Sequence, residues 1–395
     1  MPPAGRGNDH VNLVQPLRIL PSVVARPVAD GWLLGSVLVL LAFSIVMVFS
    51  AALGTHGGVA GGLSVLFKHL FSIGLGLALA VLAASVPISI WQTLSRFLLP
   101  LGAVLLALLL LPGIGREING STRWFPVGPL HFQPSELVKV LVVLFLADHF
   151  VRNAQAVSSF RVGIVEPALV VSGLGVLLML EPDLGCTVVI LMTTLGMMFL
   201  AGTRLTYIGG AVLAAVSVVI VLIGSADYRL ERFRGFLDPF ADPYGSGFQL
   251  VQALIALGSG EWLGVGLGAS VQKLFYLPHA SNDFLAAVIG EELGLAGIAV
   301  LVALYTVILW RAFNIGDRAA GAGKLYAARV AQGIGLLLIL QMMFHLAVNL
   351  GMVPTKGLTL PLMSSGGSSM LANCFAVGLL FSAERSLPAS RSEAR

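Results

Sequence analysis

Long apolar runs, each close to 20 residues in length, follow one another through most of the sequence. The chain has 395 residues, of which 57% are hydrophobic and 11% are charged. A soluble domain carries about 25% charged residues, and a soluble core would not bury this much apolar surface. Since an α-helix of about 20 residues spans a bilayer, the sequence predicts an all-α integral membrane protein.

The apolar runs predict ten transmembrane helices. They cover residues 31–53, 65–85, 94–112, 135–151, 163–181, 184–202, 206–225, 284–310, 329–352 and 359–382. Together they define a membrane domain at 31–385, flanked by polar tails at 1–30 and 386–395. The first tail lacks the short apolar core of a cleavable signal peptide, which predicts that it is a cytoplasmic tail.

Basic residues predict the orientation, because cytoplasmic connections are enriched in Lys and Arg. With the N-terminus inside, 14 of the 23 Lys and Arg residues fall on the inner side: Arg6, Arg18, Arg26, Arg96, Arg152, Arg161, Arg204, Arg311, Arg318, Lys324, Arg329, Arg385, Arg391 and Arg395. Both termini are therefore predicted to be cytoplasmic. The long connection 226–283, between the seventh and eighth helices, is then periplasmic. Its apolar part, 248–275, contains Gln249, Gln252, Glu261 and many small residues, which favours helices at or re-entering the outer interface over an eleventh span.

Three carboxylates lie around the start of the eighth predicted helix, in the stretch LPHASNDFLAAVIGEELG. A charge inside a span is costly and marks either a functional site or a structural pair. Asp283, at the outer end, is placed either to cap the helix or to contribute to a site. Glu291 and Glu292 lie two turns deeper, and the favoured interpretation is a tie from each to a cation or to backbone.

Further polar residues gather in the predicted outer connections. In NGSTRWFPVGPLHFQPSELVKV, Arg123 and Trp124 suit an interface, and Glu136 and Lys139 have the spacing of a pair on one helical face. In GMVPTKGLTLPLMSSGGSSM, which contains Lys356, the prolines and glycines predict a broken helix start with backbone N–H groups facing a cavity. In EPDLGCTVVI, the aspartate is expected to cap the sixth helix.

These clusters indicate an outer cavity in which Arg123, Lys356 and Asp283 bind a phosphate-bearing amphiphile. The residues alone fit both an enzyme that acts on a lipid-linked substrate and a transporter. The net charge of +4 comes from scattered basic residues, and the sequence has no motif that reads nucleic acid.

The stretches quoted above, together with YRLERFRGFLDPFADPYGSGFQL and GVGLGASVQKLFYLP, occur in the order and spacing of the SEDS family (FtsW, RodA and SpoVE). The resemblance extends over residues 31–385, and PTKGLTLP is more similar to FtsW, the division member, than to RodA. It implies a ten-helix peptidoglycan glycosyltransferase that polymerises lipid II at the outer face of the bacterial inner membrane, at the division septum. It also implies a class B penicillin-binding protein and other divisome membrane proteins as partners.

The resemblance places the aspartate that the family requires for polymerisation at Asp283. We expect this carboxylate to act as general base or as a ligand for a divalent cation, Mg²⁺ or Mn²⁺. The expected substrate-binding residues are Lys356, Arg123, Trp124, Glu136, Lys139, Ser365 and Gly366. The chain departs from the family pattern at His279, Ser281, Asn282 and Ser365. Alternatives are a lipid II flippase, with Glu291, Glu292, Glu136 and Lys139 along a transport path, and the same polymerase chemistry in cell elongation.

Overall fold

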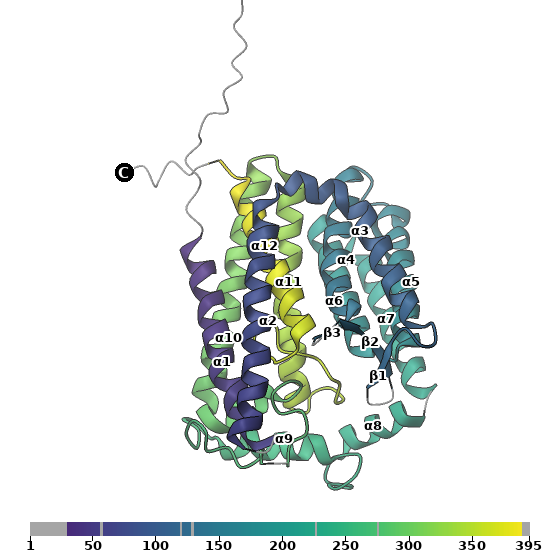
Figure 1. Cartoon of the computed structure of the whole chain (residues 1–395). Helices are drawn as coiled ribbons and strands as arrows, with labels where there is room; N and C mark the ends of the chain where they lie inside the picture. The colour runs from purple at the N-terminus through teal and green to yellow at the C-terminus, as the bar shows by residue number, and fades with distance from the viewer. Residues whose placement is uncertain are drawn as a thin grey trace, which may run out of the picture.

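The computed structural model describes residues 30–388, with gaps at 56–57, 119–120, 128–129, 226 and 275. The predicted tails lie outside the described residues, apart from residue 30 and residues 386–388. The described part is a helical bundle with one small three-stranded antiparallel sheet (Figure 1). The helices are α1 (Gly31–Thr55), α2 (Val59–Ser85), α3 (Ile88–Leu109), α4 (Pro134–Arg152), η1 (Arg161–Val165), α5 (Glu166–Leu180), α6 (Leu184–Ala201), α7 (Leu205–Gly224), α8 (Asp227–Leu237), α9 (Phe248–Ser259), α10 (Leu285–Gly321), α11 (Leu325–Asn349) and α12 (Gly367–Arg385).

Eight membrane-crossing candidates, by length and composition, are present in the described part: α1, α2, α3, η1 with α5, α6, α7, α10 and α11. The helices α4 and α12 have 19 residues each but are less apolar. Most of their side chains are buried against other helices, so they do not need the hydropathy of a lipid-facing helix. The membrane-protein class is confirmed, whereas the count of ten spans stays a prediction.

Several predicted boundaries were wrong. The tenth span was predicted from residue 359, but α12 begins at Gly367, because residues 350–366 form an irregular connection with two prolines and three glycines. The second and third helices begin six residues earlier than predicted, at Val59 and Ile88. The helix α10 continues to Gly321, beyond the apolar run that defined the prediction. Hydropathy locates the apolar part of a helix and misses its polar ends.

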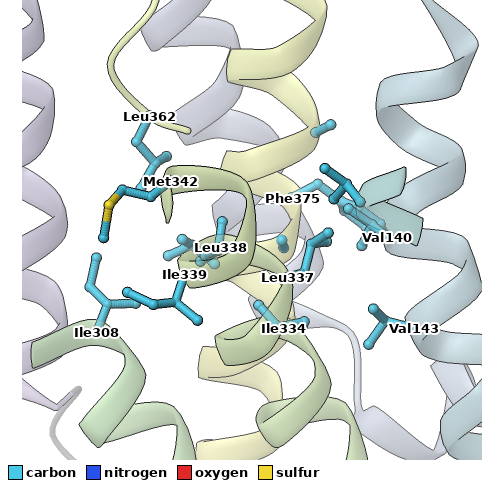
Figure 2. Packing of buried hydrophobic residues seen from close by; sticks show 14 of the residues in the cluster. Val140, Val143, Ile308, Ile334, Leu337, Leu338, Ile339, Met342, Leu362 and Phe375 are labelled. Carbon is cyan, nitrogen blue, oxygen red and sulfur yellow. The ribbon is translucent and has the colours of Figure 1, made fainter. Parts of the chain in front are cut away.

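The helix α11 lies at the centre of the bundle and packs against α4, α6, α10 and α12. Figure 2 shows Leu337, Ile339 and Met342 of α11 among Val140 of α4, Ile308 of α10 and Phe375 of α12. The start of α1 and the end of α12 lie at one end of the bundle, and α8 and α9 lie at the other (Figure 1). With 12 residues, α9 is about 18 Å long, which is too short to span a hydrocarbon core of about 30 Å.

A break in α10 anchors the connection that follows α9. Gly294 has φ 65°, a left-handed value, and a Cβ there would collide with the backbone nitrogen of Gly264. The break leaves some backbone groups of α10 without partners inside the helix, and backbone groups of residues 261–266 hydrogen-bond them instead. The N–H groups of Val265 and Gly266 donate to the carbonyls of residues 291 and 292, and those of residues 295 and 296 donate to the carbonyls of residues 261 and 262.

The two glutamates of α10 are structural ties, as the favoured interpretation predicted. Glu292 is fully buried, and its Oε1 lies 2.7 Å from Lys273 Nζ and 2.6 Å from Ser50 Oγ. Glu291 accepts hydrogen bonds from Ser270 Oγ and from the backbone N–H of Val271 at 2.9 Å. Lys273 was not predicted as a partner, because it lies in the connection and only the break in α10 brings it close.

The connection after α3 forms the sheet, which the sequence analysis did not predict, with β1 (Arg116–Ile118), β2 (Ser121–Val127) and β3 (Leu130–Phe132) in that order. In the antiparallel pairing of β2 with β3, Phe125 lies opposite Phe132. The sheet covers the start of α4 at the same end of the bundle as α8 and α9 (Figure 1).

Candidate functional site

A polar cavity of about 600 Å³ lies at this end of the bundle, between β2, the starts of α4, α6, α9 and α12, and two irregular segments, 279–284 and 355–359. The residues that line it are Arg123, Trp124, Gln133, Glu136, Cys186, Gln249, His279, Asn282, Asp283, Phe284, Thr355, Lys356, Gly357, Thr359, Gly366, Ser368 and Ser369. Six of the eight predicted site residues are therefore brought together, although they come from four distant parts of the chain. The other two, Lys139 and Ser365, do not line the cavity.

Asp283 occupies a turn just before α10. The turn is held by the carbonyl of His279, which accepts the N–H groups of Asn282 at 2.9 Å and Asp283 at 3.1 Å. His279 has φ 55°, a left-handed value that costs roughly 1–2 kcal/mol for a residue with a Cβ. The N-cap position of α10 is Phe284, one residue after Asp283, and the first-turn N–H of Ala287 donates to Asn349 Oδ1 of α11 at 3.1 Å. Asp283 therefore does not hold the N-cap position that the sequence allowed.

The segment after Pro354 approaches the Asp283 carboxylate closely. A Cβ added to Gly357 would lie 2.9 Å from Asp283 Oδ2, so only a glycine leaves room for the carboxylate in its present position. The N–H of Leu358 donates to the carbonyl of Lys356 at 3.0 Å, which folds residues 356–358 into a tight turn with Gly357 at its apex. Lys356 and Asp283 thus face one cavity, although they are far apart in the sequence.

Hydrogen bonds tie the Asp283 turn to the start of α12. Ser364 Oγ donates to the carbonyl of Asn282 at 2.7 Å, and the N–H of Ser365 donates to the carbonyl of Ser281 at 3.1 Å. Ser365 Oγ also donates to Ser281 Oγ at 3.3 Å. Two of the four departures from the family pattern, Ser281 and Ser365, therefore contact each other.

Arg123 joins the sheet to the turn between α5 and α6. Its Nε donates to the carbonyl of Glu181 at 2.6 Å and its Nη2 to the carbonyl of Pro182 at 2.5 Å. Its Nη1 has no hydrogen-bond partner among the described residues and remains available to a ligand in the cavity. In the same turn, Asp183 caps α6 by accepting the N–H of Cys186 at 3.2 Å, as predicted.

The predicted pair on α4 is present. Lys139 Nζ lies 3.0 Å from Glu136 Oε2, and both side chains are almost fully buried. Glu136 lines the cavity, whereas Lys139 turns away from it and donates to Gln341 Oε1 of α11 at 2.8 Å. The pair supports the cavity wall, and Lys139 has a structural contact that the sequence did not indicate.

Glu181 lies fully buried behind Arg123, and its carboxylate oxygens have no hydrogen-bond partner among the described residues. Burial, and to a smaller extent the charge of Asp183, raise the pKa of Glu181 to about 8, although the nearby Arg123 guanidinium opposes the shift. The folded protein therefore carries an extra proton here, at pH values where an unfolded glutamate with its ordinary pKa of 4.5 has lost it.

This proton makes stability depend on pH. Stabilisation from the protonated carboxyl is complete below the unfolded pKa and is lost as the pH rises through the folded pKa of about 8. We expect Glu181→Gln, which is neutral and similar in shape, to match the wild type in thermal unfolding at pH 5 and to be more stable at pH 8. Parallel pH curves of the two proteins would contradict this assignment.

The sequence-based prediction missed several uncharged residues of the cavity, which are Gln133, Gln249, Thr355, Thr359, Ser368 and Ser369. Single Thr, Ser and Gln residues beside apolar runs give no distinctive signal. For a metal ion, the described residues contain no group of three or more His, Cys, Asp or Glu side chains. The carboxylates that line the cavity are those of Asp283 and Glu136, and so few protein ligands suit a cation such as Mg²⁺ that is coordinated largely by substrate phosphates and water.

Comparisons with known proteins agree on one family. A sequence model described as a cell cycle protein of the FtsW, RodA and SpoVE group matches residues 31–388. The chain is 48% identical over 354 residues to the probable peptidoglycan glycosyltransferase FtsW of Thioalkalivibrio sulfidiphilus, covering 89% of this chain and 88% of that protein. It is 44% identical over 384 residues to the protein of the same name from Allochromatium vinosum, covering 96% of each.

Solved structures show the same fold. A structure described as a peptidoglycan synthase complex that coordinates polymerization and crosslinking contains a chain that matches with a TM-score of 0.73 and 31% identity. The match covers 91% of this chain and 98% of that one. The rod-shape-determining protein RodA of Thermus thermophilus matches with a TM-score of 0.65 and 29% identity, over 94% of this chain and 100% of that one.

Proposed function

The chain belongs to the FtsW, RodA and SpoVE family of cell cycle proteins, and from this premise we propose that it is a peptidoglycan glycosyltransferase that polymerises lipid II for septal wall synthesis. The observation that carries the proposal is the cavity, which brings the Asp283 carboxylate together with two cations, Lys356 and Arg123. This combination suits a sugar linked to a lipid diphosphate, because the reaction needs a base at one end and positive charge at the other.

In the proposed reaction, a sugar hydroxyl of one substrate attacks the anomeric carbon of a second. As the new carbon–oxygen bond forms, the hydroxyl proton passes to the Asp283 carboxylate, which acts as general base. The bond between the anomeric carbon and the diphosphate oxygen breaks, and the diphosphate leaves with the electron pair. A diphosphate is a good leaving group, so the second carboxylic acid that glycosidases use to protonate a poor one is not required.

The leaving diphosphate gains negative charge, which Lys356 Nζ and Arg123 Nη1 are placed to stabilise. Arg123 is fixed by its two hydrogen bonds to backbone carbonyls, so its guanidinium is held in place before the substrate arrives. A divalent cation bound by the diphosphate and Asp283 would add further positive charge. If such a cation takes part, EDTA should stop polymerisation and added Mg²⁺ or Mn²⁺ should restore it.

An apolar groove extends the site into the bundle. It has a volume of about 370 Å³ and lies between α6 and α7, lined by Leu191 of α6 and by Ala215 and Val219 of α7. Lys356 lines both the groove and the polar cavity. A lipid diphosphate with its prenyl chain in the groove would therefore place its phosphates next to Lys356 and its sugar near Asp283.

The groove can be tested by filling it. Ala215→Phe places a ring in the groove, and we expect it to raise the KM for lipid II with an undecaprenyl chain several-fold while leaving a short-chain analogue unaffected. The matched control is Ala214→Phe, because Ala214 is exposed and does not line the groove. Equal KM changes for both chain lengths, or for both variants, would contradict a prenyl site here.

The side of the membrane to which the cavity opens also supports the proposal. The cavity lies at the end of the bundle that holds α8 and α9 (Figure 1). The opposite end collects the basic residues Arg152, Arg161, Arg204, Arg318, Lys324 and Arg385, which are near the ends of their helices. By the positive-inside rule, we propose that this basic end is cytoplasmic and that the cavity opens to the periplasm, where the glycan is needed.

The proposed partner is a class B penicillin-binding protein, which would crosslink the glycan that this chain makes. The support is the structural match to a chain from a peptidoglycan synthase complex. The names of the relatives favour division over elongation, so we also propose a location at the septum with other divisome membrane proteins. A fluorescent fusion that follows the lateral wall instead of the septum would favour the elongation role.

The deciding experiment is polymerisation of lipid II by the purified protein, alone and with its penicillin-binding partner. We expect glycan strands that a muramidase degrades. Transport of lipid II across vesicles without polymer would favour the flippase alternative. That alternative has no specific support here, because the Glu291 and Glu292 side chains bind residues of the connection 260–273.

A further inference from the structure

Three buried polar side chains follow one another along the face of α11 that borders the site. Gln341, His345 and Asn349 are spaced by four residues, so they lie on one side of the helix at intervals of about 6 Å. Each is at most 1% exposed. We call them the α11 polar row. Since buried polar groups are costly in a central helix, their hydrogen bonds indicate what they do.

All three members of the row bond to the backbone of the two segments that form the cavity. Gln341 Nε2 donates to the carbonyl of Thr359 at 3.0 Å, and His345 Nδ1 lies 2.7 Å from the carbonyl of Leu358. Asn349 Nδ2 donates to the carbonyl of Asp283 at 3.2 Å, and its Oδ1 accepts the N–H of Ala287 at 3.1 Å.

The hydrogen bond of His345 defines its tautomer. Because a carbonyl only accepts, Nδ1 must carry a proton, and in the neutral imidazole Nε2 is then unprotonated. Nε2 has no hydrogen-bond partner among the described residues. The side chain is therefore used for one purpose, which is to hold the chain immediately after Gly357.

The row fixes Asp283 and Gly357 from the same rigid helix. Asn349 holds the backbone of Asp283. His345 and Gln341 hold the two residues that follow Gly357. The Cβ position of Gly357, which a hydrogen occupies, faces Asp283 Oδ2. Gln341 Oε1 also accepts a hydrogen bond from Lys139 Nζ. Lys139 is paired with Glu136, so this bond links the row to another wall of the cavity. The distance across the cavity therefore depends on contacts to α11.

We propose that Gln341, His345 and Asn349 are positioning residues, which set the Asp283 carboxylate against the Lys356–Gly357 turn for glycosyl transfer. This inference rests on the proposed function. None of the three lines the cavity, so none is proposed to touch the substrate. Their contribution acts through the geometry of Asp283 and Lys356, and a displacement of about 1 Å in such a site lowers turnover by about 100-fold.

Two substitutions of His345 separate positioning from packing. In His345→Asn, the amide nitrogen takes the place of Nδ1 and keeps the bond to the carbonyl of Leu358. In His345→Gln, the longer side chain carries its amide to the position of Nε2 and loses that bond. Both variants are neutral and polar, and they differ from each other by one methylene group.

The experiment measures two quantities on full-length wild type and both variants in complex with the penicillin-binding partner. Hydrogen exchange of peptides covering 354–362 reports whether the turn is held. Turnover and KM with lipid II report the consequence. We expect His345→Gln to speed exchange in these peptides and to lower kcat about 10- to 100-fold with little change in KM. His345→Asn is expected to restore both quantities towards the wild type.

Equal exchange in the two variants would overturn the proposal, and so would equal kcat. If the wild type forms no polymer, the proposed function fails, and the exchange contrast still decides whether His345 holds the turn. If a His345 variant fails to fold, hydrogen exchange will be faster throughout α11. In that case, hydrogen exchange of peptides covering 354–362 in Gln341→Glu decides the outcome. That side chain keeps the acceptor for Lys139 but loses the donor to Thr359, so only the proposal expects faster exchange in 354–362.

Discussion

Asp283→Asn is expected to lower the rate of lipid II polymerisation by about 10²–10⁴-fold, the contribution typical of a positioned general base. Asparagine has nearly the same shape as aspartate, so it fits in the space beside Gly357. It cannot accept the proton of the attacking hydroxyl, and its amide oxygen is a weak ligand for a cation. The loss is therefore expected whether the carboxylate acts as base or as metal ligand.

The fold should tolerate this change, because the residue is held through its backbone. The N–H of residue 283 donates to the carbonyl of His279, and its own carbonyl accepts Asn349 Nδ2. Thermal unfolding and copurification with the penicillin-binding partner should therefore be unchanged. Asp238→Asn is the matched control, since Asp238 is an exposed acid of the connection between α8 and α9 and does not line the cavity. A wild-type rate in Asp283→Asn would remove Asp283 from the mechanism.

The sequence predicted the helices well because lipid imposes one strong rule, an apolar run of about 20 residues for each exposed span. The prediction was weakest where this rule does not apply. The helix α4 is surrounded by protein, so Glu136, Lys139 and Asp148 are tolerated in it through specific partners. At α12 the chain continues apolar for several residues before the helix starts, because Leu358, Leu360 and Leu362 of the irregular connection are themselves buried in the bundle.

The charged residues of the site could be predicted from the sequence. The contacts between distant segments that bring these residues together could not. Asp283, Lys356 and Arg123 were found because a charge near a span demands an explanation. Their convergence depends on contacts between distant segments, such as Arg123 with the turn between α5 and α6. The α11 polar row was missed, although polar residues at intervals of four in an apolar helix are a signal that the sequence contains.

The departures from the family pattern gain a partial physical account. Ser281 and Ser365 hydrogen-bond each other across the two segments, so a change at one position alters the surroundings of the other. Asn282 and His279 line the cavity beside Asp283. The polymerisation assay on the wild type tests whether this set of neighbours supports activity. Because the segments are also tied through backbone groups, the position of Asp283 does not depend on these side chains alone.

Gly357→Ala is expected to lower polymerisation about 100-fold. The added methyl group would lie 2.9 Å from Asp283 Oδ2, closer than real Cβ contacts allow, so one of the two groups must move. The turn around Gly357 is fixed by Leu358 and Thr359 through the α11 polar row, so we expect the Asp283 carboxylate to be the group that moves. This movement takes the base away from the attacking hydroxyl.

The backbone at Gly357 does not have the left-handed conformation that only glycine favours, so alanine introduces no strain of its own there. Gly258→Ala is the control, because a Cβ at Gly258 in α9 meets no atom within 4 Å. We expect this control to retain wild-type activity. If Gly357→Ala keeps full activity, the present position of the carboxylate is not the one used in the reaction. A large fall in melting temperature would instead show that the turn, and not Asp283, yields to the methyl group.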